Sequence, residues 1–398
     1  MPTGLRGVVG HPRIALRLGT SIWHARRNDD GTFRFWTDGP NGGGAIDARA
    51  VVVATGATEL VLPFPGWDLP GVMTAGAAQT LVKAQGVLPG RRVLVAGTGP
   101  FLLPVAAALA KAGAAVAVAD CARPGLRVPV LAGLAHPGKA AEAGGYMATL
   151  ARHRVPVWFG QAVAACEGTD RVQRVKLVST DGSKGRPGRT LQVDAVCASF
   201  GFVPSLDLPR ALGCAERPHP VLPLSTVAHD ADQATSVPGV FAAGEVTGIG
   251  GAHVALLEGL VAGAAAARFL GRPAATPDRS MRLRLRRARR FAALLERLYP
   301  PDAGWLERLT DDTVMCRCED VRWRAVRDAL DHGAGDLRAV KGTTRCGMGY
   351  CQGRMCGPAL QLAVRALTGR QDVGDFATRS IATPVPIRAI ADLEDFRR

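Results

Sequence analysis

Residues 91–120, RRVLVAGTGPFLLPVAAALAKAGAAVAVAD, form the segment that most restricts the fold of this chain. An apolar run leads into a glycine turn, and a helix-forming segment of about twelve residues follows and ends at Gly113. A second apolar run then ends at Asp120. Two strands joined by one helix make a βαβ unit, and such a unit belongs to a parallel sheet covered by helices. The segment therefore predicts an α/β protein.

A second strand, glycine turn and helix lie at residues 238–270, PGVFAAGEVTGIGGAHVALLEGLVAGAAAARFL. A buried strand directly before Gly244 and Glu245 would let the glycine admit a diphosphate and let the carboxylate accept from a ribityl hydroxyl. The alternative is a turn whose glycine serves only packing. The β-rich residues 13–56 include the expected strands RIALRLGTSIWHA, GTFRFWTDG and ARAVVVATGA. Two interleaved nucleotide-binding folds account for this order.

The glycine turn of the first unit has a weaker signature than the GxGxxG motif. Gly97 and Gly99, followed by Pro100, could bring phosphate oxygens to backbone N–H groups at a helix N-terminus. Asp120 lies 23 residues after Gly97, where an acid would contact a ribose hydroxyl. Leu102, however, replaces the third glycine. The turn predicts a site for NAD(P) or another adenine nucleotide, and the alternative is a domain that has lost its ligand.

The net charge of +15 does not indicate a nucleic-acid-binding protein. Only six of the 49 basic residues are lysines, and the arginines are scattered through every segment. One local cluster, RSMRLRLRRARRFAALLERLYP, predicts a basic helix. It is either a solvated linker helix or a helix that contacts an acidic partner or the inner face of a membrane.

No long apolar segment predicts a membrane span. The longest apolar region, residues 101–119, is interrupted by Pro104, Lys111 and Gly113. The N-terminal sequence has no apolar signal core, so we expect a cytoplasmic protein with reduced thiols.

Five of the nine cysteines lie within 41 residues near the C-terminus. Cys316 and Cys318 form a CxC motif, and Cys346, Cys351 and Cys356 follow at five-residue intervals. Clustered thiols in a reduced compartment are more often metal ligands than disulfides. Four soft thiolates suit either a zinc ion or an iron–sulfur cluster, and the CxxC pairs that zinc sites commonly use are not present here.

Three quoted segments carry a family resemblance. They are ATGATELVLPFPGWDLPGVMTAGAAQTLVKAQGVLPGRRVLVAGTGP, FAAGEVTGIGGA, and CRCEDV with TRCGMGYCQGRMCGPA. Together they resemble the A (alpha) subunits of heteromeric, FAD-linked amino-acid dehydrogenases, which include opine oxidase, proline and hydroxyproline dehydrogenases, and the B subunit of hydrogen cyanide synthase. The cysteine module is similar to bacterioferritin-associated ferredoxin, which implies Cys316, Cys318, Cys351 and Cys356 as [2Fe-2S] ligands, with Cys346 as an alternative.

The resemblance implies an α/β fold with two interleaved Rossmann-like domains and a small C-terminal helical domain. The expected parts are an incomplete FAD-binding domain in residues 1–90 and 201–271, an NAD(P)-like domain in 91–200, a linker in 272–312, and a [2Fe-2S] domain in 313–398. The remaining expected FAD-site residues are Thr55, Gly56, Ala57, Gly251 and His253. The first FAD motif of such proteins is missing, which implies a truncated N-terminus or a chain that cannot hold FAD in the usual way.

In that family, a beta-type flavoprotein subunit oxidises the C–N bond of an amino acid or amine, and a small third subunit can join the complex. This chain would carry electrons away through FAD and a [2Fe-2S] cluster. Its eight dispersed histidines predict no catalytic base. Two alternatives stay open: a self-sufficient NAD(P)H-dependent FAD oxidoreductase, and a non-catalytic cofactor-binding or redox-sensing subunit.

Overall fold

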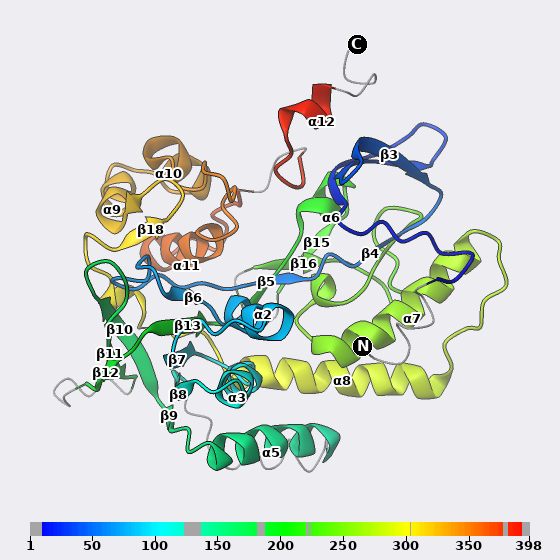
Figure 1. Cartoon of the computed structure of the whole chain (residues 1–398). Helices are drawn as coiled ribbons and strands as arrows, with labels where there is room; N and C mark the ends of the chain where they lie inside the picture. Colours follow the sequence, from blue (N-terminus) through cyan, green and yellow to red (C-terminus); the bar gives the residue numbers. More distant parts are fainter. Residues whose placement is uncertain are drawn as a thin grey trace.

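The computed structural model describes residues 10–122, 137–180, 188–219, 222, 224–302, 304–376 and 381–391. Its largest sheet has five parallel strands in the order β6-β13-β7-β8-β9 (Figure 1). These strands are β6 (Val72–Thr74), β7 (Arg92–Gly97), β8 (Ala115–Asp120), β9 (Val157–Phe159) and β13 (Ala195–Ser199). The predicted βαβ unit is confirmed, because α3 (Leu102–Lys111) joins β7 to β8.

Alternating side chains of β7 face two different layers. Val93 and Val95 pack in one core with residues of α3, whereas Leu94 and Ala96 pack in another with residues of a second sheet. The first layer contains α2 (Ala75–Gln85), α3 and α5 (Pro137–Arg152). The second contains the antiparallel strands β10 (Gln161–Glu167), β11 (Arg174–Ser179) and β12 (Thr190–Gln192). Both faces of the parallel sheet are therefore covered.

A second nucleotide-binding unit is built on a short parallel pair, β4 (Val51–Val53) and β17 (Val240–Ala242). The helix α7 (Gly251–Phe269) packs on this pair and on α8 (Arg279–Leu298). The smaller elements are β5 (Ala57–Glu59) with β14 (Phe202–Pro204), β15 (Glu216–Pro218) with β16 (Ser225–Val227), α6 (Asp207–Ala211) and η1 (Glu245–Thr247).

The N-terminal strands form the antiparallel sheet β1 (Ser21–Arg27), β2 (Phe33–Gly39) and β3 (Gly42–Ala48). We expected the first strand to begin at residue 13, and this was wrong. Ile14, Leu16 and Leu18 are exposed outside any strand, because this alternating run has no partner strand among the described residues. Residues 1–9, which belong to the segment expected to lack a GxGxxG motif, lie outside the described residues.

The cysteine-bearing module follows α8. After η2 (Leu306–Arg308) it contains β18 (Val314–Cys316), β19 (Val321–Arg322), α9 (Trp323–Asp331), α10 (Leu337–Thr344) and α11 (Gly357–Thr368). The last element, α12 (Ile387–Ala391), packs on β3, far from α11 (Figure 1). Ala382 N–H donates to the carbonyl of Trp23 in β1. The segment after α11 therefore crosses from the module to the N-terminal sheet.

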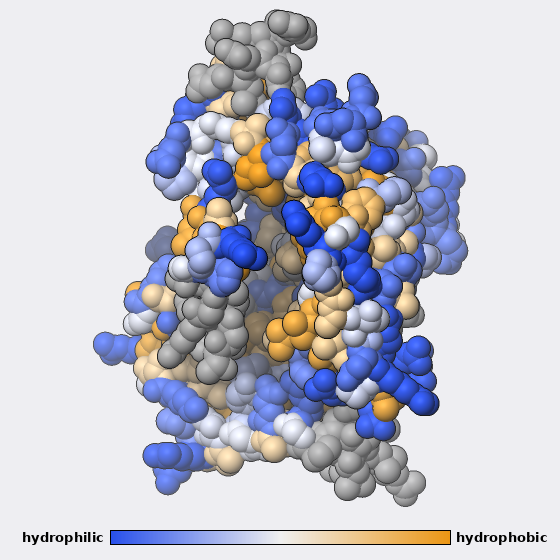
Figure 2. All heavy atoms as spheres, turned by 90° about the vertical axis from the view of Figure 1, so that its right-hand side faces the viewer, coloured by the Kyte–Doolittle hydropathy of each residue, from blue (hydrophilic) through white to orange (hydrophobic). Residues whose placement is uncertain are grey.

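The helix α7 has the length and apolar composition of a membrane-spanning helix, and about a third of it is buried. Its Glu258 carboxylate is almost fully buried and paired with Arg289 of α8 at 2.7 Å. This ion pair and the packing on β17 and β4 show that one face of α7 lies against the folded body, while Leu256 and Leu260 on another face are exposed. Figure 2 shows a largely hydrophilic face, hollowed near its centre, with apolar patches beside the hollow.

Candidate metal centre and nucleotide-binding loops

Three cysteine side chains converge in the C-terminal module. The sulfur atoms of Cys316, Cys346 and Cys356 lie within 4.8 Å of one another, and all three residues are buried. Hydrogen bonds from the Cys346 and Cys356 thiols lower the pKa of Cys316 to about 2. The same contacts with Cys316 raise the pKa of both partner thiols. A thiolate inside a group of sulfur atoms is the form that binds a soft metal.

The two other cysteines of the module lie beside this group. Burial raises the pKa of Cys318, and its hydrogen bond with the Cys351 thiol raises it further. Cys351 also lies close enough to Cys346 to raise that thiol's pKa. A Cβ on Gly349 would fall 2.3 Å from Cys318 Cβ, so only glycine allows this close approach of the two loops. The converging sulfurs belong to two of the four expected ligands, Cys316 and Cys356, and to the alternative, Cys346, while Cys318 and Cys351 lie beside them.

This donor set fits a [2Fe-2S] cluster. Such a cluster takes four thiolates, and the module holds five free cysteines, of which Cys316, Cys346 and Cys356 have converging sulfurs. Gly347 and Gly353 have φ of 84° and 82°, so the backbone turns sharply on both sides of Cys351. Arg345 pairs with Glu319 at 3.0 Å, and Arg354 with Asp207 at 3.3 Å. Cationic side chains therefore lie close to a site that becomes anionic when its thiols ionise.

The Gly244 loop is held by the buried carboxylate of Glu258. Gly244 N–H and the Thr247 hydroxyl both donate to Glu258 Oε2 at 2.8 Å. Arg289 of α8 donates to the other carboxylate oxygen at 2.8 Å. The sequence pattern did not predict the roles of Glu258 and Arg289. Glu258 belongs to the mainly apolar helix α7, and Arg289 is one of many arginines in α8, a helix whose pattern indicates a solvated surface.

The Glu245 carboxylate accepts hydrogen bonds at the N-terminus of α7. Its carboxylate accepts from Gly251 N–H at 2.7 Å and from Gly250 N–H at 3.2 Å. Burial raises the pKa of Glu245, and the two backbone hydrogen bonds oppose that rise. His253, also expected near a cofactor phosphate, is exposed on the first turn of α7. The acid expected to accept from a ribityl hydroxyl thus binds the N–H groups of its own loop.

At the Gly97 loop, the expected ligand-binding acid likewise accepts a hydrogen bond from the neighbouring backbone. A Cβ on Gly97 would fall 1.7 Å from the Ser199 carbonyl oxygen, so this glycine permits the contact between β7 and β13. Asp120 is 4% exposed and accepts from Ala122 N–H at 2.9 Å. Burial raises its pKa to about 7. Tyr299, which follows α8, lies over Gly99, with its Cβ 3.8 Å from where a Gly99 Cβ would stand.

The segment Thr55–Gly56–Ala57 lies at the crossover between the two nucleotide-binding units. Thr55 Oγ1 donates to the Ser205 carbonyl at 2.7 Å, and Ser205 N–H donates to the Gly56 carbonyl at 3.0 Å. Ala57 begins β5, which pairs with β14. The predicted site residues therefore occupy three separate places: the cysteine group, the Gly97 loop with Asp120, and the Gly244 loop with the Thr55 crossover.

The FAD half-site is incomplete among the described residues. Gly244 and Glu245 lie at the turn where the ribityl half of a flavin site was predicted, but the described chain has no strand, GxGxxG turn and helix for the ADP half. The parallel sheet of this unit, β4 with β17, has only two described strands.

Comparison with protein families matches two parts of the chain. Residues 9–259 match the pyridine nucleotide-disulphide oxidoreductase model, and residues 314–364 match the BFD-like [2Fe-2S] binding domain. The first match includes the Gly97 and Gly244 loops, and the second includes the five clustered cysteines. The chain therefore has a FAD/NAD-binding oxidoreductase fold followed by a [2Fe-2S] domain.

Curated and solved relatives agree with these matches. The chain is 33% identical to the opine oxidase A-type subunit of Agrobacterium tumefaciens (strain Ach5) over 87% of this chain and 70% of that protein. It is 32% identical to the hydrogen cyanide synthase HcnB subunit of Pseudomonas aeruginosa over 87% of this chain and 77% of that protein. The crystal structure of L-proline dehydrogenase from P. horikoshii matches with a TM-score of 0.64 and 22% identity, over 93% of this chain and 64% of that chain.

Proposed function

Because the chain belongs to the pyridine nucleotide-disulphide oxidoreductase family, which is flavin-dependent, and carries a BFD-like [2Fe-2S] domain, we propose that it is an electron-transfer subunit of a heteromeric dehydrogenase. The proposed substrates of the complex are amino acids or amines, oxidised at a C–N bond on a partner flavoprotein subunit. The names of the relatives support this proposal, since two of them are subunits of an opine oxidase and of a hydrogen cyanide synthase.

The convergence of the cysteine sulfurs carries the proposal. Electron transfer requires a redox centre in a fixed place more than it requires acid–base groups. Cys316 and Cys356 come from segments forty residues apart, yet their sulfurs lie within 4.8 Å together with that of Cys346. A bound [2Fe-2S] cluster would supply one-electron chemistry at this place, and the residues of the chain hold and orient it.

The closed Gly97 loop weighs against a self-sufficient NAD(P)H oxidoreductase. The Asp120 carboxylate is turned onto its own loop, and Tyr299 covers Gly99. A dinucleotide would need both the acid and the glycine backbone. If NADH reduces the purified chain, this alternative displaces the electron-transfer subunit.

The test is anaerobic purification with iron and sulfide assay and EPR of the dithionite-reduced protein. We expect about two iron and two sulfide per chain and an S = 1/2 signal. Co-expression with a candidate flavoprotein subunit should then give a stable heteromer that reduces the cluster when substrate is added. Zinc in place of iron would contradict the proposal and leave a structural or redox-sensing subunit.

A further inference from the structure

The CxC loop is attached to the nucleotide-binding body by a tryptophan. Trp67 lies in the loop before β6 and is 3% exposed. Its indole Nε1–H donates to the Val314 carbonyl at 2.5 Å, two residues before Cys316. The guanidinium of Arg317, between the two cysteines of CxC, stands 5.0 Å from the centre of the Trp67 ring and donates to the Asp68 carbonyl at 3.1 Å. Trp67 and Asp68 of the body therefore contact the CxC loop both before Cys316 and between its two cysteines.

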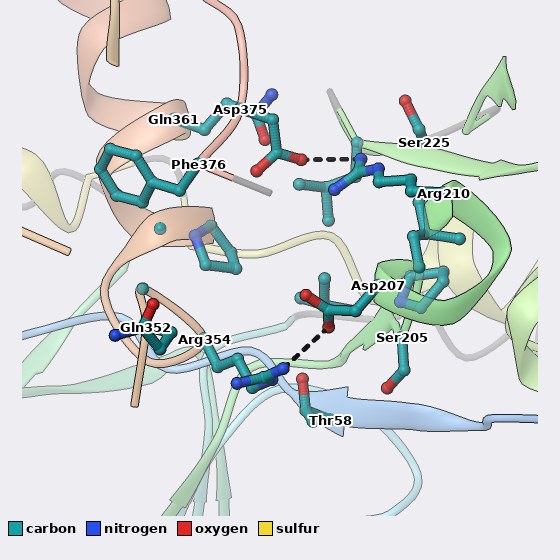
Figure 3. Close-up of a pocket in the computed structure, with 17 residues that line it drawn as sticks. Thr58, Ser205, Asp207, Arg210, Ser225, Gln352, Arg354, Gln361, Asp375 and Phe376 are labelled. Atoms are coloured by element: carbon teal, nitrogen blue, oxygen red, sulfur yellow. Dashed lines mark ion pairs between the residues drawn. The ribbon is translucent and has the colours of Figure 1, made fainter. Parts of the chain in front are cut away.

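The second cysteine loop is attached at another point of the body. Arg354 lies between Cys351 and Cys356, and its guanidinium pairs with Asp207 at the start of α6 at 3.3 Å (Figure 3). The same side chain donates to the Cys351 carbonyl at 3.4 Å and to the Ala382 carbonyl. Arg354 therefore joins the cysteine loop both to the body and to the segment that crosses to the N-terminal sheet.

A small cavity of about 90 Å³ lies at this seam. Arg210 and Asp375 form a second ion pair across it at 2.8 Å, besides the Arg354–Asp207 pair (Figure 3). Thr58 and Ser205 line the cavity from the side of the body. Ser205 is the residue that binds the Thr55–Gly56 crossover, so the cavity lined by the cysteine loop also borders the segment that joins the two nucleotide-binding units.

The apolar core is continuous across the same seam. One cluster of buried residues includes Trp67, Leu62 and Leu94 of the body together with Met315, Cys316 and Leu360 of the module. A module with its own separate core could move as a rigid unit on a linker. A module that shares a core with the body cannot leave it without exposing apolar surface to water.

We propose that Trp67 and Asp207 are positioning residues for the [2Fe-2S] centre, each fixing one of the two cysteine loops on the nucleotide-binding body. The centre is then a stationary relay beside the Thr55–Ser205 crossover. This inference rests on the proposed function, because it requires that the cysteine loops hold a [2Fe-2S] cluster.

Trp67→Phe tests the first attachment in the full-length, cluster-loaded chain. The substitution keeps an aromatic ring but removes the N–H donor to Val314. We expect the cluster to be lost to a chelator about tenfold faster, with a shifted midpoint potential and a changed EPR line shape. Trp158→Phe is the control for replacing an indole ring under an arginine, because Arg189 stands 4.9 Å from the centre of the Trp158 ring. That control should leave the potential and the line shape unchanged.

Asp207→Asn tests the second attachment. We expect faster hydrogen exchange both in residues 203–211 and in residues 351–358, together with a shift of the cluster potential. Asp194→Asn is the control, since Asp194 is 29% exposed, against 28% for Asp207, and pairs with Arg92 within the body. Asp207→Glu keeps the carboxylate and should therefore keep slow exchange at both loops.

The outcomes separate this inference from the proposed function. A wild-type chain without iron contradicts the proposed function. A loaded wild-type chain whose potential, EPR spectrum and exchange are the same in Trp67→Phe, Asp207→Asn and the two controls overturns the positioning role. Equal changes in the seam variants and in the controls also overturn it, because they would reflect general destabilisation.

Discussion

The cysteine loops and the glycine loops of this chain differ in how each prepares a binding site. The cysteine side chains point toward one another, and three of their sulfurs lie within 4.8 Å. In the glycine loops, Asp120 and Glu245 instead accept hydrogen bonds from backbone N–H groups of their own loops. Thiols have few alternative partners, whereas carboxylates and free N–H groups satisfy one another when no ligand competes. Side-chain identity therefore determined the first kind of site, and local hydrogen bonding determined the second.

The largest expected effect concerns the cysteine loops. Cys351→Ser should lose most of the bound iron, because one of the four proposed ligands is removed. Cys346→Ser is the matched substitution, and it should keep near wild-type iron if the ligands are the four that the family resemblance implies, although the Cys346 sulfur lies within 4.8 Å of those of Cys316 and Cys356. Iron content and the EPR signal measure both. If Cys346→Ser lost its iron and Cys351→Ser kept it, Cys346 would be the ligand in place of Cys351.

The next effect concerns the backbone of the Gly97 loop. Gly97→Ala would put a Cβ 1.7 Å from the Ser199 carbonyl oxygen at a φ of 133°. We expect a loss of about 3 kcal/mol or more in the free energy of unfolding, because β7 and β13 must separate. Gly144→Ala in the exposed part of α5, where nothing lies within 4 Å, should instead stabilise the protein by about 0.5 kcal/mol. Denaturant unfolding gives both values, and similar values would contradict the packing role of Gly97.

A smaller effect concerns the acid of the same loop. Burial raises the pKa of Asp120 to about 7 from 3.8, so the folded protein holds this proton more tightly than the unfolded chain does. The contribution of Asp120 to the free energy of unfolding should therefore fall as the pH rises from about 4 to about 7. Asp120→Asn cannot ionise. Its free energy of unfolding, relative to that of wild type, should therefore rise by on the order of 2 kcal/mol from pH 5 to pH 8. If the free energies of unfolding of the two proteins depended on pH in the same way, Asp120 would not titrate between pH 5 and pH 8.

The smallest effect is expected at the Gly244 loop. His253 is exposed at the start of α7, so His253→Ala should change the free energy of unfolding by less than about 0.5 kcal/mol. Thermal unfolding of the two proteins is the measurement. A large loss would show that His253 makes a structural contact at the start of this helix.

Much of the fold followed from periodicity and glycine placement. The βαβ unit at residues 91–120 and the strand and helix around Gly244 were predicted, because apolar runs bounded by glycine turns have few alternative folds. The strand expected from residue 13 was wrong, since alternation alone cannot tell a paired strand from an exposed segment. Spacing also grouped the five cysteines, but it could not say which thiols meet.

The contacts that hold the site in place were not predictable from local sequence. Trp67 and Val314 are 247 residues apart, and Asp207 and Arg354 are 147 apart. Glu258 and Arg289 belong to two helices whose own patterns indicate an apolar core helix and a solvated basic helix. Such pairs depend on how distant elements dock, and one sequence contains no direct record of that docking.

The continuous core between body and module also sets an order of events during biosynthesis. Trp67 leaves the ribosome long before Cys316 and Cys356, and its apolar neighbourhood stays open until Met315 and Leu360 have been made. At about 5–20 residues per second, that interval lasts tens of seconds. An iron–sulfur cluster could therefore be inserted only late in synthesis. A nascent chain halted before the module would leave apolar surface around Trp67 exposed to chaperones and proteases.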